Sequence, residues 1–356
     1  MATAVDFFSG MGMMTYGHLM EGINVVAGLE IDGRRCGVYE DNLKVRAFRA
    51  DLSSLTAAEL RGMTEGAKRP LVAVGCPPCQ SFSSLHRTRG AAAAFDPRTE
   101  LVSRFGTLAV SLKPEAIVFE NVGGILNRQN LPYFGRYLKA LEASGYLTAS
   151  GVLDAADFGV PQHRRRVIAV SVRRGLGAEP SLPEPTHSRD GGAGRRKWVT
   201  VRDAIGDLKP LNSGERDPGD PLHYARLHTE NTLKIIRAIP KDGGSRRDLP
   251  DELVLPCHRR LGRRGAESVY GRMKWDEPSP TITSRAISPS SGRFIHPEQD
   301  RGITLREMAR LQTIPDDFKT AGPTEAVAGM IGDAVPPELA RAIARHVKRI
   351  LKEAGY

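Results

Sequence analysis

Two cysteines, Cys76 and Cys79, stand three residues apart in the stretch GCPPCQSFS, in a chain that contains four cysteines in all. Such a pair could carry out dithiol exchange, bind a metal, or supply one nucleophilic thiol. Dithiol motifs normally open a helix, whereas two prolines followed by polar residues predict a rigid turn that leads into a loop. Zinc needs two further ligands, and Cys257-His258 does not repeat the spacing. The pattern favours a nucleophilic thiol, and we expect no metal.

The first residues of the chain could hold a nucleoside cofactor. The stretch DFFSGMGMMTYG starts at Asp6. Its two glycines, Gly10 and Gly12, let the backbone turn tightly and approach a ligand. Glu30 ends the next apolar run, twenty residues after Gly10. At this spacing, an acid in a nucleoside-binding α/β unit accepts hydrogen bonds from ribose hydroxyls. Thr15 occupies the place of the third glycine of a dinucleotide motif. A cofactor with ribose and adenine but no pyrophosphate, such as S-adenosylmethionine, is therefore favoured over NAD.

Two further groups of polar residues flank apolar runs. VFENVGG has Glu120 and Asn121 at the end of one run, and QHRRR has Gln162, Arg164 and Arg166 just before another. Taken singly, such a glutamate is as often a helix cap, and an arginine run is more often solvated surface. Taken together, these groups bring a thiol, an acid and two guanidinium groups to one sheet edge.

The elements that must position these residues follow from the apolar pattern. Short continuous apolar runs alternate with helical stretches over the first 170 residues. Continuous runs indicate strands covered on both faces, so we expect an α/β fold with a doubly wound, mostly parallel sheet. From about Arg173 the chain becomes rich in Gly, Pro and Arg, which indicates a second, smaller domain. Regular structure returns after Gly302, with one helix in TLREMARLQ and another after GDAVPPELA.

Composition narrows the possible partners. The chain of 356 residues has 51 Lys and Arg against 41 Asp and Glu, a net charge of +10, which suits a polyanion but also solubility alone. Residues 171–300 hold 23 of these cations against 18 acids, with basic pairs such as Arg195-Arg196 and Arg246-Arg247. Few cysteines and no membrane-spanning apolar run predict a soluble cytoplasmic protein without disulfides.

Taken in order, these residues resemble the cytosine-C5 DNA methyltransferases of the bacterial modification type. The resemblance extends over nearly the whole chain, and only the stretch from about 176 to 300 matches chiefly in position, where the family has its variable target-recognition domain. The matching motifs are D-x-F-x-G-x-G at 6–12, the acid Glu30, Asp51, P-C-Q at 78–80, E-N-V at 120–122, Q-x-R-x-R at 162–166, R-L-Q at 310–312 and G-x-x-V at 332–335.

The resemblance implies a domain division and a reaction. The fold would be Rossmann-like, with 1–175 and 320–356 forming the cofactor-binding and catalytic domain. Residues 176–319 would form the target-recognition domain, with the helix 304–314 at the junction. S-adenosylmethionine would supply a methyl group to C5 of a flipped-out cytosine in a specific duplex DNA sequence.

Catalytic roles follow residue by residue from the same resemblance. Cys79 would add to C6 of the cytosine and form a covalent adduct, while Cys76 only packs. Glu120 would protonate or hydrogen-bond N3 of the base. Arg166 would hold O2, and Arg164 would support Cys79 and Glu120.

Binding residues are implied in the same way. Those expected to contact the cofactor are Phe8, Ser9, Gly10, Gly12, Glu30, Ile31, Asp51, Leu52, Pro78, Leu101, Asp333 and Val335. Asp333 stands where the family usually has asparagine. The loop from Gln80 to Arg98 would close over DNA through Gln80, Ser81, Ser83, Ser84, His86 and Arg87.

The expected partner is double-stranded DNA. We expect a bacterial or archaeal monomer that is associated with the nucleoid and does not contact a membrane. A companion restriction endonuclease is a further possible partner. One alternative is methylation of tRNA cytosine, but the Cys-Phe-Thr tripeptide of that branch is absent from the chain. Another is an idle DNA-binding regulator on the same scaffold, although each catalytic position is filled. The target sequence depends on base-edge contacts that no short motif encodes.

Overall fold

The computed structural model describes residues 1–78, 82, 96–260 and 268–356. Contacts divide the chain into two compact units. Unit 1 consists of Met1–Asp154, Arg165–Pro185 and Val335–Tyr356, and unit 2 of Ala155–Arg164 and Thr186–Ala334. These units differ from the expected domain bounds in the segments 155–164, 176–185 and 320–334. The catalytic and target-recognition roles of the two domains stay predictions.

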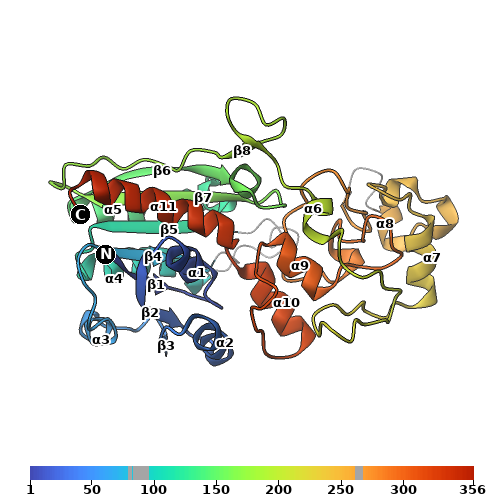
Figure 1. Ribbon diagram of the computed structural model, residues 1–356, viewed down its shortest axis with the longest axis horizontal. Helices are drawn as coiled ribbons and strands as arrows, with labels where there is room; N and C mark the ends of the chain where they lie inside the picture. The colour runs from blue at the N-terminus through green and yellow to red at the C-terminus, as the bar shows by residue number, and fades with distance from the viewer. Residues whose placement is uncertain (79–81, 83–95, 261–267) are drawn as a thin grey trace. The chain divides into compact units, whose positions relative to one another are not determined.

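Unit 1 contains a seven-stranded sheet with the strand order β3-β2-β1-β4-β5-β7-β6 (Figure 1). The strands are β1 (Thr3–Phe7), β2 (Asn24–Glu30), β3 (Ala47–Arg49), β4 (Leu71–Gly75), β5 (Ala116–Val122), β6 (Tyr146–Asp154) and β7 (Arg165–Arg173). The first five are parallel, and β7 lies antiparallel between β5 and β6. Every residue of β1 and β4 is buried, as in strands covered on both faces. The expected α/β fold with a mostly parallel sheet is confirmed.

Helices of unit 1 cover this sheet. They are α1 (Met13–Met20), α2 (Gly33–Leu43), α3 (Ala57–Met63), α4 (Leu101–Ser111), α5 (Leu131–Ala143) and α11 (Pro337–Glu353), with short 3-10 turns η3 (Pro97–Glu100) and η4 (Gly123–Leu126). The C-terminal α11 lies beside α1 (Figure 1), so closely that a Cβ on Gly17 would be 2.6 Å from that of Ala340. Rings from β5, α4 and α5 form an aromatic core, in which those of Phe119 and Tyr137 are 4.8 Å apart.

Unit 2 has shorter elements. They are η5 (Ala155–Phe158), β8 (His187–Ser188), β9 (Arg196–Lys197), α6 (Val201–Ile205), α7 (Glu230–Ala238), η6 (Arg246–Asp248), η7 (Asp251–Leu253), α8 (Pro256–Arg260), η8 (Pro289–Ser291), α9 (Leu305–Leu311) and α10 (Thr324–Asp333). The helix expected at 304–314 is α9, and Thr304 and Glu307 form its capping box. No helix in the described part of the chain is long and apolar enough to cross a membrane.

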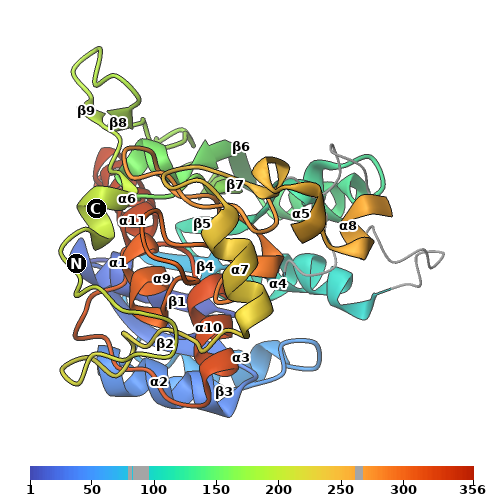
Figure 2. The same cartoon turned by 90° about the vertical axis from the view of Figure 1, so that its right-hand side faces the viewer.

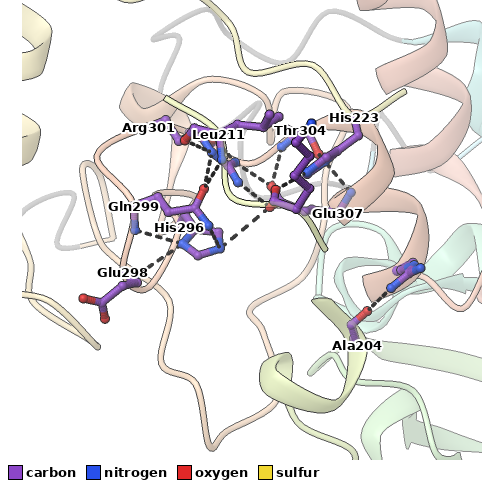
Figure 3. A network of polar contacts seen from close by, with 12 residues as sticks. Ala204, Leu211, His223, His296, Glu298, Gln299, Arg301, Thr304 and Glu307 are labelled. Atoms are coloured by element: carbon purple, nitrogen blue, oxygen red, sulfur yellow. Dashed lines mark hydrogen bonds and ion pairs between the residues drawn. The ribbon is translucent and has the colours of Figure 1, made fainter. Parts of the chain in front are cut away.

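A buried ionic network joins the loops of unit 2 (Figure 3). Arg301 donates to both carboxylate oxygens of Glu307, at 2.8 and 2.7 Å, and to Gln299 Oε1 at 2.9 Å. Burial alone would raise the pKa of Glu307, but the Arg301 charge and its hydrogen bonds outweigh burial and lower that pKa to about 2. Burial lowers the pKa of His296, which lies 3.8 Å from Glu307, to about 4. Ionic contacts thus fix loops that little regular structure supports.

Candidate active site

The glycine turn after β1 forms the first part of the site. Phe8, Gly10 and Gly12 all have positive φ, of 58°, 56° and 97°. A Cβ on Gly12 would lie 2.3 Å from Leu43 Cδ1, so this position requires glycine for space as well as for conformation. Ser9 Oγ is buried and has no hydrogen-bond partner among the described residues. The turn therefore contains one hydroxyl that a ligand could satisfy.

Glu30, at the end of β2, closes this turn. Its Oε2 accepts the Gly10 N–H at 2.9 Å, and its Oε1 accepts those of Ile31 and Asp32 at 2.8 and 2.9 Å. Sequence reasoning predicted a bond to ribose but not these three bonds to the main chain. Two carboxylate oxygens can accept about four hydrogen bonds, so Oε2 keeps capacity for a ligand hydroxyl. The next side chain, Ile31, is 59% exposed although apolar.

Asp51 and Leu52 follow β3 and are fixed from α4. Arg104 Nε donates to the Leu52 carbonyl at 3.0 Å, and the same guanidinium contacts Leu55 O. Hydrogen bonds from Ser53 lower the pKa of the exposed Asp51. Leu101, the first residue of α4, is half-buried. Arg104 was not predicted, because a lone arginine inside a helical stretch carries no signal for such a contact.

Beneath the turn, Asp6 is fully buried. Its Oδ2 accepts the Thr15 hydroxyl at 2.6 Å, and Thr15 Oγ1 also lies 2.8 Å from the Tyr39 hydroxyl. Burial raises the pKa of Asp6 to about 7. Sequence reasoning used Thr15 only as evidence against a dinucleotide site, whereas the structure gives it a role in joining β1 to α1 and α2.

The turn that leads to Cys79 is held from two strands. The Cys76 N–H donates to Phe7 O at 3.3 Å, and Asn121 Nδ2, at the end of β5, donates to Pro77 O at 3.0 Å. Asn121 is fully buried, so the E-N-V motif fixes the main chain two residues before Cys79. Among the expected catalytic and DNA-binding residues, those outside the described residues are Cys79, Gln80, Ser81, Ser83, Ser84, His86 and Arg87.

Glu120 and Arg166 form an ion pair across β5 and β7. Arg166 Nε lies 2.9 Å from Glu120 Oε1, and the two side chains are only 10% and 8% exposed. The antiparallel register explains the pair, since Arg166 is opposite Val122 and Glu120 is opposite Ile168. A buried carboxylate beside a guanidinium has its orientation fixed. The structure thus brings together two of the four expected catalytic residues.

Two hydrogen bonds of Arg164 lie within unit 2. Its Nη1 donates to Ile282 O at 2.9 Å and its Nη2 to Gly332 O at 3.1 Å. Gln162 Nε2 donates to Gln312 Oε1 at 2.9 Å, while Gln162 Oε1 accepts the Ile282 N–H, also at 2.9 Å. The Q-x-R-x-R, R-L-Q and G-x-x-V motifs therefore meet in one buried cluster. The catalytic role of Arg164 stays a prediction.

The last expected cofactor residues differ in burial. Asp333 is the exposed final residue of α10 in unit 2. Val335 is buried in unit 1, and Pro78 is half-buried. Gly332, beside Asp333, has no room for a side chain, because a Cβ there would lie 2.2 Å from Ser284 N. Contact of these residues with a cofactor stays a prediction.

A mostly parallel α/β sheet with a glycine turn, an acid at the end of the second strand and a buried Glu-Arg pair defines a protein of the Rossmann-like class. Residues 2–349 match the family model described as C-5 cytosine-specific DNA methylase. The chain belongs to this family and is a DNA (cytosine-5)-methyltransferase.

Individual relatives agree with this membership. The chain is 34% identical over 353 residues to the type II methylase M.HgiDII of Herpetosiphon aurantiacus, covering 98% of this chain and 95% of that one. It is 32% identical to the type II methyltransferase M.XorII of Xanthomonas oryzae pv. oryzae, covering 98% and 85%. A crystal structure of a DNA modification methyltransferase encoded within a prophage (E. coli) shares the fold, with a TM-score of 0.76, 22% identity and coverage of 99% and 100%.

Proposed function

We propose that this enzyme transfers a methyl group from S-adenosylmethionine to C5 of a flipped-out cytosine in a specific duplex DNA sequence, through a covalent bond between Cys79 and C6. The observation that carries the proposal is the buried Glu120–Arg166 pair, on the strand whose Asn121 also holds the turn before Cys79. This arrangement brings an acid and a cation to the same sheet edge as Pro77, which precedes Cys79 by two residues in the chain.

The described residues fit S-adenosylmethionine. Glu30 Oε2 has capacity for a ribose hydroxyl, and the exposed Ile31 and half-buried Phe8 offer apolar surface to an adenine ring. The unpartnered Ser9 hydroxyl lies in the glycine turn and suits a carboxylate or amine. The bound cofactor supplies an electrophilic methyl group.

Cys79, Glu120 and Arg166 each act on the target cytosine. C5 of cytosine is a weak nucleophile, so the Cys79 thiolate adds to C6 and shifts electron density to C5. Glu120 donates a proton or hydrogen bond to N3, which stabilises the charge that develops there. Arg166 orients the Glu120 carboxyl and holds O2 of the base. C5 then takes the methyl group, and water accepts the proton that leaves C5. The C6–sulfur bond breaks to release the Cys79 thiolate, and N3 returns its proton to Glu120.

The names of the relatives suggest the biological setting. Those compared above are called type II methylases, and by analogy we propose that this enzyme marks host DNA in a restriction-modification system. Unit 1 would then carry cofactor and catalysis, and unit 2 would include the target-recognition part. A cytoplasmic location and a companion endonuclease belong to the same proposal.

The test uses the purified full chain with methyl-labelled S-adenosylmethionine. We expect label at cytosine C5 of duplex DNA, in one short sequence that methylome sequencing of an expressing host also reveals. Label in tRNA but not in DNA would instead support the tRNA alternative. DNA binding without label in either substrate would support the idle regulator.

A further inference from the structure

A loop of unit 2 concentrates positive charge that the site above does not use. Between β8 and β9, as Figure 2 shows, the chain forms an open loop. Residues 187–198 contain four exposed cationic side chains and one acid, Asp190: the cations are Arg189, Arg195, Arg196 and Lys197. Among the described residues, none of these four forms an ion pair or a side-chain hydrogen bond.

Neighbouring acids compensate this charge only in part. A hollow of about 490 Å³ lies at the base of the loop, and its lining includes Arg189, Lys197 and the single loop acid, Asp190. Two further lining residues, Asp276 and Glu277, are paired elsewhere, with Arg202 at 2.7 Å and with Lys274 at 3.0 Å. Like charges held close together repel each other, so this loop is more stable when a polyanion binds it.

The base of the loop is fixed. Trp198 Nε1 donates to Asp157 Oδ1 at 2.9 Å, and its ring meets that of His163 edge-on at 4.8 Å. The Trp198 N–H donates to Ser188 O and the Arg196 N–H to Thr186 O, both at 3.0 Å. The cations therefore extend from a loop whose base is ordered, which lowers the conformational entropy lost on binding.

We propose that the β8–β9 loop binds the phosphate backbone of duplex DNA, with a phosphate received between Arg189 and Lys197. The proposal rests on the proposed function, which makes DNA the substrate. One guanidinium group can donate two parallel hydrogen bonds to two oxygens of the same phosphate. Proteins that bind single strands use exposed aromatic rings for stacking, and the one aromatic side chain of the loop, Trp198, is engaged by Asp157 and His163. Contacts to the phosphate backbone contribute affinity but carry no sequence information.

The test compares two double variants of equal charge change. Arg189→Ala/Lys197→Ala removes the two loop cations that the proposal assigns to the phosphate. The control, Arg61→Ala/Lys68→Ala, removes two exposed cations of unit 1. Arg61 lies on α3, and the Lys68 carbonyl accepts from Thr3. Fluorescence anisotropy gives Kd for duplex DNA from about 50 to about 200 mM salt. Thermal unfolding checks that both variants fold.

We expect the slope of log Kd against log salt to fall by about 1 to 2 in the loop variant, since each lost phosphate contact removes ~0.9, and to stay at the wild-type value in the control. Asp190→Asn, which removes the acid of the loop, should tighten binding. An unchanged slope in the loop variant, or lost discrimination between target and non-target DNA at unchanged slope, would overturn the proposal. Wild-type methyl transfer to DNA tests the proposed function separately.

Discussion

Asp6 illustrates at the residue scale how burial changes a carboxyl group. Burial raises its pKa from 3.8 to about 7, although the hydrogen bond from Thr15 lowers the pKa. The unfolded chain releases this proton near pH 4, and the folded chain only near pH 7. The stability that the protonated group contributes is therefore fully present below about pH 4 and lost as pH rises to about 7, a change on the order of 4 kcal/mol.

Asp6→Asn should remove this pH dependence, because the amide does not titrate. Urea unfolding at several pH values should show the variant gaining stability relative to wild type between about pH 4 and about pH 7. Asp51→Asn is the control, since Asp51 is exposed and hydrogen bonds lower its pKa. Its effect should be constant above about pH 5. Parallel profiles for Asp6→Asn and wild type would contradict the burial argument.

Asn121 acts through the main chain of Pro77. Asn121→Ala leaves the Pro77 carbonyl without this donor and loosens the turn that leads to Cys79. We expect kcat to fall by about 10- to 100-fold, as for small misplacements of a reacting group, while the affinity for S-adenosylmethionine is retained. Steady-state kinetics and calorimetric titration measure the two effects. An unchanged kcat would show that the turn does not need this bond.

At the element scale, the glycine turn connects β1 to α1. Gly12→Ala should destabilise the protein by about 2 to 4 kcal/mol, because the new Cβ meets Leu43 and Tyr39 and the residue has positive φ. Gly10→Ala is the matched control, since its Cβ would have nothing nearer than 4.0 Å and only the φ cost of about 1 kcal/mol remains. Thermal or urea unfolding compares them. Equal losses in the two variants would mean that packing is not the cause.

The ionic network around α9 predicts acid sensitivity of unit 2. The pKa of Glu307 is lowered to about 2 and that of His296 to about 4. Both groups contribute stability at neutral pH that is lost on acidification, His296 from about pH 6.5 to 4 and Glu307 from about pH 4.5 to 2. Glu307→Gln leaves the buried Arg301 charge unpaired and should cost about 3 to 5 kcal/mol. Unfolding measured at pH 7 checks this, and a loss below about 1 kcal/mol would contradict it.

Elements with strong apolar patterns could be predicted from sequence. Continuous apolar runs gave β1 and β4, and helical spacing with an early proline gave α11. The antiparallel direction of β7 could not be predicted, because VIAVSV carries no signal of direction. Which basic residues of 171–300 are buried could not be predicted, because buried and exposed arginines occur in the same charged stretch. Arg246 is buried, and Arg272 is fully buried and donates to main-chain carbonyls.

For the whole molecule, the order of motifs predicted the family and its enzymatic activity correctly, whereas the contacts that support the site came only from the structure. Arg104, Thr15 and Gln312 act through partners distant in sequence, such as Leu52 and Gln162. Such contacts depend on tertiary packing, which spacing along one chain does not encode. The units defined by contacts likewise assign 155–164 to unit 2, where Gln162 Oε1 accepts the Ile282 N–H.

The central claim concerns one covalent bond, and DNA with 5-fluorocytosine at the target cytosine tests it most directly. Fluorine at C5 cannot leave as a proton does, so the enzyme should stay bound to the base through Cys79 after methyl transfer. Wild type and Cys76→Ala should form a complex that survives denaturing electrophoresis, and Cys79→Ala should form none. Peptide mapping of the complex should locate the nucleotide on Cys79. A trapped complex with Cys79→Ala, or its loss with Cys76→Ala alone, would contradict the account.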